Sequence, residues 1–526
     1  RRFLRACAGA RAVPLPLPFA VGASARINVA GRDITDRELL ALAEMLKVRR
    51  PVEEVDLSGN ALLTDRALAP FLEQLLDDPV ALSLRRLSLS RCVRAAAATT
   101  EAVVELLRSV DGLRHLDLSH TQIGARWQLP LCEAAALQPC LEHVNLGDTG
   151  LCRSASGAQC VAALLGEESK VKHLDLSWNV LSAECFSRLG EAAARHPTLR
   201  SLSVSNCSSA TQEADPPVAF FLEHLARGAA LSQLDLSVNR VDFRVALVLE
   251  DALQHNTKVK RLILSENPLG ILGLRSLLRL LVDERSALMH LDTERCSGSD
   301  ALGQDGQVFR ATNPGGRYDL DLRRPYHRAL LRRLYAAGER LQVAPEVMFQ
   351  SLTYSQPPYV HAGKGAGGVW QTPTSGALRF HIDASLLVEV TAKGVDSGDF
   401  AGCLQRHLGA TRLRPGPRQA VPLLARWAEL EGRRQEQLCF LGALGKDFEL
   451  PVAVLERICR SAPDLAGEAV ARLLPCLPGD RASRCLGLLL LPAAGVYMRV
   501  RDRLGAFLEF GAENPSGHYH LDLAEC

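Results

Sequence analysis

A short pattern that recurs through the first three hundred residues constrains the fold of this 526-residue chain more than any other feature. The pattern is leucine-x-x-leucine-x-leucine-x-x followed by asparagine, cysteine or threonine, with valine in place of some leucines. Copies occupy residues 52–60, 84–92, 113–121, 141–149, 171–179, 199–207, 231–239, 259–267 and 288–296, and a degenerate copy includes Ile27 and Val29. Equivalent positions lie 28 to 32 residues apart. Repeats of this length predict a solenoid, because one unit can bury its apolar residues only against its neighbours.

Each copy has the alternation of a β-strand, with the central leucines on one face and the residues between them on the other. We expect successive strands to align at Ile27, Val55, Leu87, Leu116, Val144, Leu174, Leu202, Leu234, Leu262 and Leu291. Apolar residues between the strands recur at helical spacing, for example in 36–46, 101–107 and 243–253. The repeat resembles that of the leucine-rich-repeat family, in its ribonuclease-inhibitor-like class. The resemblance implies an α/β horseshoe solenoid with a parallel sheet on the concave side and helices on the convex side.

The asparagine, cysteine or threonine that closes each copy can satisfy backbone groups where the chain turns away from the sheet. Cys92, Cys207 and Cys296 occupy this position, so we interpret them as structural thiols. The chain has 15 cysteines in all, without a C-x-x-C pair or zinc spacing. An odd number in a large chain without a secretion signal indicates reduced thiols and an intracellular compartment.

The strand register also predicts which side chains face outward on the concave side. Histidines share one column and aspartates the next, and we take this face as the candidate partner-binding surface. Large aromatic anchors are scarce there, although Trp178 and Trp127 follow strands and are candidates on one rim. The candidate partner-binding residues are His115, Asp117, His143, His173, Asp175, Asp235, Arg261, His290, Asp292 and Trp178. A metal site is not expected, because no carboxylates converge from different elements.

Composition excludes several classes of partner. The 61 basic and 59 acidic residues give a net charge of +2, which provides no general attraction to nucleic acid or to an anionic membrane. The most apolar run, 485–496, is too short to span a bilayer. Residues 1–23 contain several arginines and no acidic residue, and are interpreted as a basic arm or linker; an organellar transit peptide is the alternative.

A second motif divides the C-terminal third. Phe309-x-x-x-Asn-Pro-Gly-Gly-Arg-Tyr-Asp-Leu-Asp-Leu322 returns 201 residues later as 510–523, and each copy predicts a turn and a strand within a β-hairpin module. The motif is similar to one in NPxGxYxLDL-containing proteins of unicellular eukaryotes. A basic helix is expected over 324–341 and short helices over 421–431, 434–444, 452–459, 467–474 and 483–491. The predicted domains are the arm 1–23, the solenoid 24–297, the linker, hairpin module and loop-rich segment 298–385, a small α-helical domain 386–500, and a second hairpin module from 501.

No sequence feature indicates catalysis. The glycines around Lys364 lack the spacing of a phosphate-binding loop, G-x-S-x-G is absent, and neither a cofactor nor a small-molecule substrate is predicted. The preferred hypothesis is a non-catalytic scaffold that binds other proteins of a multi-subunit assembly in the cytoplasm, with a cytoskeletal or flagellar setting. A mitochondrial complex is one alternative. A regulatory binder, such as an enzyme inhibitor or a GTPase-activating protein, is the other.

Overall fold

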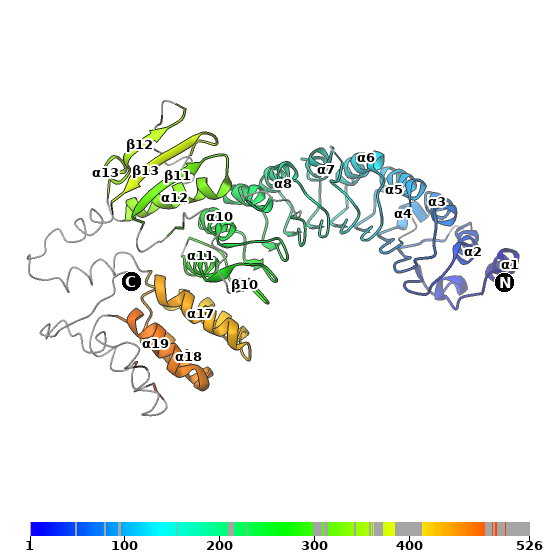
Figure 1. The fold of residues 1–526 in the computed structure, drawn as a ribbon. Coiled ribbons are helices and arrows are strands. Elements are labelled where there is room, and N and C mark those ends of the chain that lie inside the picture. The colour runs from blue at the N-terminus through cyan, green and yellow to red at the C-terminus, as the bar shows by residue number, and fades with distance from the viewer. Residues whose placement is uncertain are drawn as a thin grey trace, which may run out of the picture. The chain divides into compact units, whose positions relative to one another are not determined.

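The structure is a computed structural model (Figure 1), and it describes residues 2–47, 50–77, 80–92, 96–154, 156–208, 215–228, 230–283, 285–297, 308–309, 314–340, 343–356, 359, 361, 372–383, 413–478, 487, 490–491 and 500. The chain divides into two compact units. Unit 1 comprises residues 1–240 with 258–265, and unit 2 comprises residues 241–257 with 266–526.

The repeats form the predicted parallel sheet, with ten strands of three residues each in chain order. The strands are β1 Arg26–Asn28, β2 Glu54–Asp56, β3 Arg86–Ser88, β4 His115–Asp117, β5 His143–Asn145, β6 His173–Asp175, β7 Ser201–Ser203, β8 Gln233–Asp235, β9 Arg261–Ile263 and β10 His290–Asp292. The paired register from Ile27 and Val55 through to Leu234 and Leu262 is the one that the repeat predicts. All of these central side chains are buried, so each repeat contributes one apolar residue to a continuous core.

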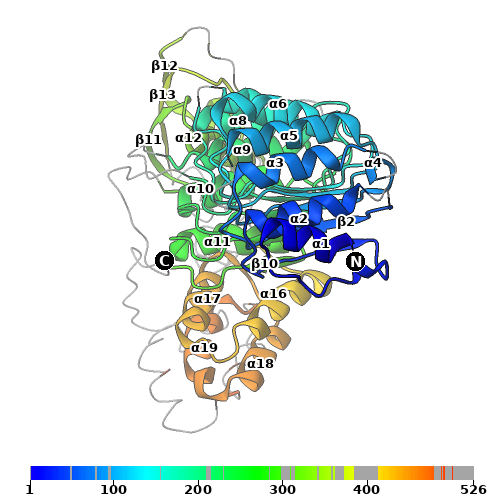
Figure 2. The same cartoon turned by 90° about the vertical axis from the view of Figure 1, so that its right-hand side faces the viewer.

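Helices lie on the other side of the sheet in unit 1 and pack on one another in chain order (Figure 1 and Figure 2). They are α2 Asp36–Leu46, α3 Asp65–Gln74, α4 Val80–Ser83, α5 Ala97–Ser109, α6 Ala125–Ala136, α7 Gly157–Leu164, α8 Ala183–Arg195 and α9 Val218–Leu222, followed by the 3-10 helix η2 Glu223–Arg227. The helices predicted over 36–46 and 101–107 are confirmed. Thr35 begins α2 with a capping box that includes Glu38, as a Thr-x-x-Glu sequence predicts.

Polar side chains at the end of each repeat copy join neighbouring repeats. Asn179 donates from Nδ2 to the carbonyls of Leu146 (2.7 Å) and Leu176 (2.9 Å), and accepts from the Leu151 amide (3.0 Å). Cys207 occupies the same position one repeat later and donates from Sγ to the Leu176 carbonyl at 3.1 Å. These side chains pair backbone groups that would otherwise be buried without partners.

The residue before this position has a left-handed backbone in repeat after repeat. Glycine suits this conformation and occupies it at Gly59 (φ 73°), but Trp178 (φ 65°) and Val238 (φ 58°) adopt it as well. A side chain with a Cβ is strained there, a β-branched one most of all. The packed repeat therefore imposes the turn even where the local sequence opposes it.

The N-terminal segment differs from the basic arm expected over residues 1–23. Residues Arg2–Ala10 form helix α1, which packs against α2 and buries Phe3 and Cys7, and Pro18–Val21 form the 3-10 helix η1. The apolar residues that recur between the arginines explain the difference, because they give the helix a face to bury against the first repeat.

Unit 2 contains the last repeat helices, α10 Phe243–Leu253 and α11 Gly270–Val282, and a small sheet that follows them. The sheet comprises β11 Gly316–Asp321, β12 Gln350–Tyr354 and β13 Ala377–Ile382, in the antiparallel order β11-β13-β12. The predicted strand after the Asn-Pro-Gly-Gly turn is confirmed as β11, but its partner β13 lies about sixty residues downstream instead of across the turn. The segment 345–385, expected to be loop-rich, contains helix α13 Pro345–Met348 and two of the three strands.

Helix α12 Pro325–Arg340 confirms the predicted basic helix, and it packs against α10. The predicted helical domain contains α16 Pro417–Glu429, α17 Arg434–Asp447, α18 Val452–Ser461 and α19 Ala466–Leu473, with the 3-10 helices η3 Pro463–Leu465 and η4 Leu474–Cys476. Most of the predicted helix 483–491 and all of the second hairpin module lie outside the described residues.

Buried charges join the helical region to the last repeat helices. Asp447 in α17 is fully buried and accepts from Arg275 Nε at 2.8 Å and from Arg279 Nη1 at 2.7 Å. Arg279 also donates to Glu250 in α10, and Glu250 accepts from Arg333 in α12 at 2.6 Å. We call these five side chains the ionic cluster. It connects four helices of unit 2 that are far apart in sequence, so the C-terminal region is built onto the last repeats.

Candidate partner-binding face

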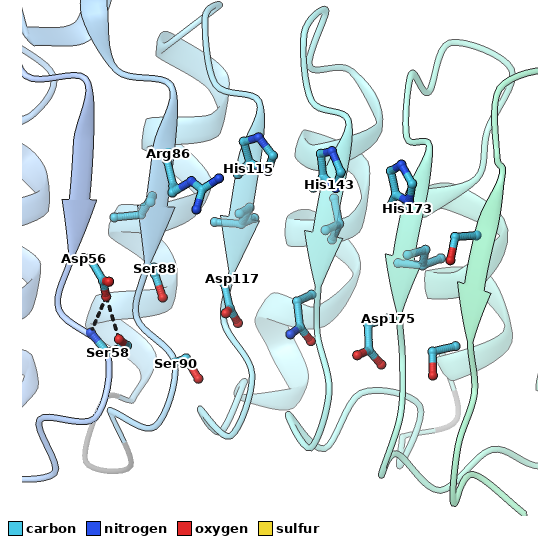
Figure 3. A pocket seen from close by; sticks show the side chains of 17 residues that line it. Asp56, Ser58, Arg86, Ser88, Ser90, His115, Asp117, His143, His173 and Asp175 are labelled. Atoms are coloured by element: carbon cyan, nitrogen blue, oxygen red, sulfur yellow. Dashed lines mark hydrogen bonds between the residues drawn. The ribbon is translucent and has the colours of Figure 1, made fainter. Parts of the chain in front are cut away.

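The open face of the sheet in unit 1 carries a shallow groove of about 530 Å³, formed by strands β2 to β7 (Figure 3). Its floor is made of the outward-facing residues of the strands, because side chains alternate between the two faces of a sheet. Polar residues dominate the lining, which includes Asp56, Ser58, Arg86, Ser88, Ser90, His115, Asp117, His143, Asn145, His173, Asp175, Ser201 and Ser203.

The first row of the groove is a stack of three imidazoles. His115, His143 and His173 are register partners on adjacent strands, and their ring centroids are 4.2 and 4.3 Å apart. The rings of His143 and His173 are nearly parallel, at 2°. Strands that are about 4.8 Å apart place equivalent side chains at stacking distance, so the repeat itself produces the stack.

The stack holds its central histidine neutral. Burial lowers the pKa of His143 to about 4, with a further contribution from the charges of His115 and His173 on either side. Burial also lowers the pKa of His115, together with the positive charges of Arg86 and Arg114. Near neutral pH, His115 and His143 therefore present uncharged imidazoles, which can donate or accept hydrogen bonds.

The second row contains the predicted aspartates, and it has a structural role as well. Asp117 Oδ1 accepts from the backbone amide of Ser119 at 2.9 Å and from its hydroxyl at 2.7 Å. Asp56 and Asp235 make the same pair of bonds to the serines two residues later, and Asp175 accepts from the Ser177 amide at 2.8 Å. These carboxylates organise the chain as it leaves each strand, so the aspartate column is partly explained by the fold.

The two tryptophans suggested as rim anchors lie in different surroundings. Trp178 follows β6 directly and is 58% exposed, which makes it available to a partner. Trp127 instead belongs to α6 and is half-buried, with the Arg126 guanidinium 5.3 Å from its ring centroid. The expectation that both lie on one rim after strands is wrong for Trp127, because the helix begins only eight residues after β4 ends.

The remaining candidate residues divide between the units. Asp235 and Arg261 lie on β8 and β9 of unit 1, where the Arg261 side chain is exposed. His290 and Asp292 lie on β10 of unit 2, where His290 Nδ1 is 3.4 Å from Glu429 of α16. His290 is therefore already engaged by the C-terminal helices, a contact that the repeat pattern does not predict.

Metal and membrane sites receive no support from the described part of the chain. Its histidines, cysteines and carboxylates include no group of three or more placed to hold a metal ion. None of the helices described is both long and apolar enough to cross a bilayer.

Comparison with known proteins finds that about half of the chain, or less, is similar to several proteins. The chain is 26% identical to NACHT, LRR and PYD domains-containing protein 5 of Bos taurus over 252 residues. These residues make up 48% of this chain and 20% of that protein. It is 35% identical over 161 residues to the human NACHT, LRR and PYD domains-containing protein 12, or 30% of this chain and 14% of that protein. It is 27% identical over 267 residues to the mouse ribonuclease inhibitor, or 50% of this chain and 56% of that protein. No family model matches the chain.

These similarities agree with the ten-stranded parallel sheet and its alternating helices. The chain is a leucine-rich-repeat protein. Because it spans only a fifth of the first of these relatives and just over half of the ribonuclease inhibitor, the similarity identifies the repeats and not a whole-protein activity.

Three cysteines of this leucine-rich-repeat protein, those at the end of a repeat copy, have the surroundings of structural thiols. Cys92 and Cys207 are fully buried, and burial raises the pKa of Cys92 to about 11 and that of Cys207 to about 12. Cys296 follows the same pattern, with a pKa raised by burial to about 11. A nucleophile or metal ligand needs the thiolate, which these surroundings disfavour.

One side chain of the groove is missing from the sequence-based candidates. Arg86 begins β3 and lies beside His115 in the register, on the same exposed row (Figure 3). The repeat from 84 to 92 carries the signal that could have found it, because the register assigns Arg86 and Ser88 to the outward face just as it assigns His115 and Asp117.

Proposed function

We propose that this leucine-rich-repeat protein is a non-catalytic scaffold that binds other proteins through the open face of its sheet. The groove carries the proposal, since it presents two rows of polar side chains on backbone that neighbouring strands hold rigidly. A site built on strands keeps its geometry better than one built on loops, which suits repeated or long-lived recognition.

The proposed contact residues combine polar specificity with a single aromatic anchor. Neutral imidazoles at His115 and His143 can be desolvated at lower cost than charged side chains. Trp178, exposed at the end of β6, offers the large contact area that binding hot spots favour. With His173, Asp117, Asp175, Asp235 and Arg261 they form the surface of unit 1 that we assign to the partner; His290 and Asp292 would contribute only from unit 2.

We place the protein in a multi-subunit assembly, with a cytoskeletal or flagellar setting preferred and a mitochondrial one as the alternative. The ionic cluster supports a structural role, because it builds the C-terminal region onto the repeats instead of leaving it on a flexible tether. A second candidate is a regulatory binder, which the similarity to a protein named ribonuclease inhibitor favours.

The proposal is tested by affinity purification of the tagged chain from its native cells, with mass spectrometry of the proteins that remain after a salt wash. The wild-type chain is compared with a face variant, His115→Ala/His143→Ala/His173→Ala. A matched control, Arg108→Ala/Arg188→Ala/Arg195→Ala, removes three exposed side chains from helices α5 and α8 on the opposite side.

We expect one large assembly at fixed stoichiometry with the wild type and with the helix variant, and its loss with the face variant. Recovery of one small protein at equal stoichiometry would select the regulatory binder instead. Partners that the face variant keeps and the helix variant loses would refute the assignment of the binding face. The co-purifying proteins also identify the compartment.

A further inference from the structure

From β3 to β9 of unit 1, the edge of the sheet at which the strands begin is basic, whereas Glu53 and Glu54 stand at the start of β2. From β3 to β9, the first residue of each strand and the residue before it include seven basic side chains and one acidic one, Glu142. The basic side chains are Arg85, Arg86, Arg114, Lys172, Arg200, Lys260 and Arg261. Since the whole chain carries a net charge of only +2, this edge concentrates positive charge that composition alone conceals.

Most of these cations have no carboxylate partner within the described part of the chain. Lys172 is the exception, since its Nζ lies 2.7 Å from Glu142 and neutralises the single acidic residue of the edge. Arg86, Arg114, Arg200, Lys260 and Arg261 are exposed, and no ion pair is formed by any of them among the described residues. Elsewhere arginines pair readily, as Arg108 does with Glu105 at 2.8 Å and Arg188 with Glu191 at 3.1 Å.

The opposite end of the strands carries negative charge. Asp117 and Asp175 lie three residues after the basic residues Arg114 and Lys172, roughly 10 Å along the strand, and Asp235 occupies the same position of β8. Figure 3 shows the two rows side by side, with Arg86 and the histidines in one and the aspartates in the other. From the strand starts onward, the sheet therefore carries a basic row, then the histidines, of which His115 and His143 are uncharged near neutral pH, and then the aspartates.

This arrangement selects among anionic partners. A nucleic acid is negative along its whole backbone and would meet the aspartates as well as the arginines. A protein segment can be acidic on one side and neutral or basic on the other, which matches both rows at once. From β3 to β9 the edge extends about 29 Å, six strand spacings, which is the length of a helix of about 20 residues.

We propose that the basic edge, defined as Arg85, Arg86, Arg114, Arg200, Lys260 and Arg261, binds an acidic segment of a partner protein. The segment lies along the edge and turns its uncharged or basic side toward the aspartate row. This rests on the proposed function and names the chemistry of the partner. Burial and then the charges of Arg86 and Arg114 lower the pKa of His115, while Glu142 and Glu54 act in the opposite direction.

The test uses the purified full chain and a labelled peptide of about 20 residues with glutamates at helical spacing along one side and alanine elsewhere, long enough to cover the edge as a helix. Binding is measured by fluorescence anisotropy at several salt concentrations. The edge variant is Arg86→Glu/Arg114→Glu/Arg200→Glu. The helix-side variant, Arg108→Glu/Arg188→Glu/Arg195→Glu, changes the net charge by the same amount on the other side, and a lysine version of the edge variant keeps the charge.

We expect the edge variant to bind the acidic peptide at least tenfold more weakly than the wild type, and the helix-side and lysine variants to bind within about twofold of it. Equal weakening by both charge reversals would overturn the proposal, because net charge alone would then explain binding. Absence of peptide binding by the wild type would overturn it as well. Tighter binding of an oligonucleotide of equal charge, lost in the edge variant, would replace it with a nucleic-acid surface.

The outcomes separate this proposal from the proposed function. If native partners depend on the histidine face but the acidic peptide does not bind, the scaffold function stands and the acidic chemistry fails. If the peptide binds but no native protein depends on the face, the edge is attractive to acidic segments while the scaffold assignment fails.

Discussion

Removal of the Asp447 carboxylate should open unit 2 and leave unit 1 unaffected. Asp447 is fully buried in α17 and pairs with Arg275 and Arg279 of α11 at 2.5 and 2.7 Å. In Asp447→Ala, the Arg279 guanidinium keeps Glu250, but that carboxylate is shared with Arg333. Arg275, whose side chain is only 12% exposed, loses the carboxylate that it contacts at 2.5 Å, and Arg279 keeps only the shared Glu250.

Leaving a buried charge without its partner costs about 3–5 kcal/mol. At about 1.4 kcal/mol per factor of ten, amide hydrogens protected by the opening of unit 2 should exchange roughly a hundred to several thousand times faster. Hydrogen-exchange mass spectrometry resolves this by segment, so peptides from α11, α16 and α17 report on unit 2 and peptides from α5 to α8 on unit 1. The matched control is Asp464→Asn, which removes an exposed carboxylate that pairs with Arg434 at 3.1 Å.

We expect no segment to change measurably in Asp464→Asn, since exposed ion pairs contribute little. If Asp447→Ala changes exchange in α11 and α17 by less than about threefold, the ionic cluster does not join the C-terminal helices to the last repeats. If unit 1 segments accelerate equally, the division into two units is not an energetic one.

Three further predictions concern the repeats and pH. Leu176→Ala, in the core of the sheet, should lower the free energy of unfolding by about 2–5 kcal/mol in urea denaturation. Val238→Gly should raise the free energy of unfolding by up to about 1 kcal/mol, because glycine relieves the left-handed strain at φ 58°. The same change at buried Val204 should lower the free energy of unfolding. A loss of stability at both positions would show that the strain at Val238 is negligible. Burial acts to raise the pKa values of Glu250 and Asp447, but the arginine charges lower them below their usual range. These carboxylates therefore stabilise unit 2 at pH values above their unfolded pKa of about 4. This stabilisation is lost as the pH falls through the folded values, so the stability difference between wild type and Asp447→Asn should shrink below about pH 4, and a difference that grows on acidification would contradict the assignment.

The repeat region could be predicted from the sequence because its information is local. Each copy specifies a strand, a turn and an apolar position in about nine residues, and the constant spacing then fixes the register of Leu174 against Val144 and Leu202. The outward rows follow from the same alternation. Arg86 follows from this alternation too, because the repeat 84–92 has the complete pattern.

The C-terminal region could not be predicted in the same way, because its contacts join segments that are distant in sequence. β11 pairs with β13 across helix α12 and β12, and no local pattern selects that partner. The buried Asp447 is similarly unremarkable in sequence, at the end of an ordinary helix, until α11 brings two arginines to it. The helix Arg2–Ala10 buries only Phe3 and Cys7, so its apolar face is too small to distinguish it from a basic arm in the sequence.

Site-specific photo-crosslinking tests the central claim, that the open face of the sheet is the partner-binding surface, most directly. A photoreactive amino acid is placed at position 143, in the middle of the histidine row, and in a second protein at position 188, on helix α8. After irradiation in the native cell, we predict a covalent partner at position 143 and none at position 188. The same partner attached only at position 188, or no protein attached at position 143 while the chain remains in its assembly, would contradict the account.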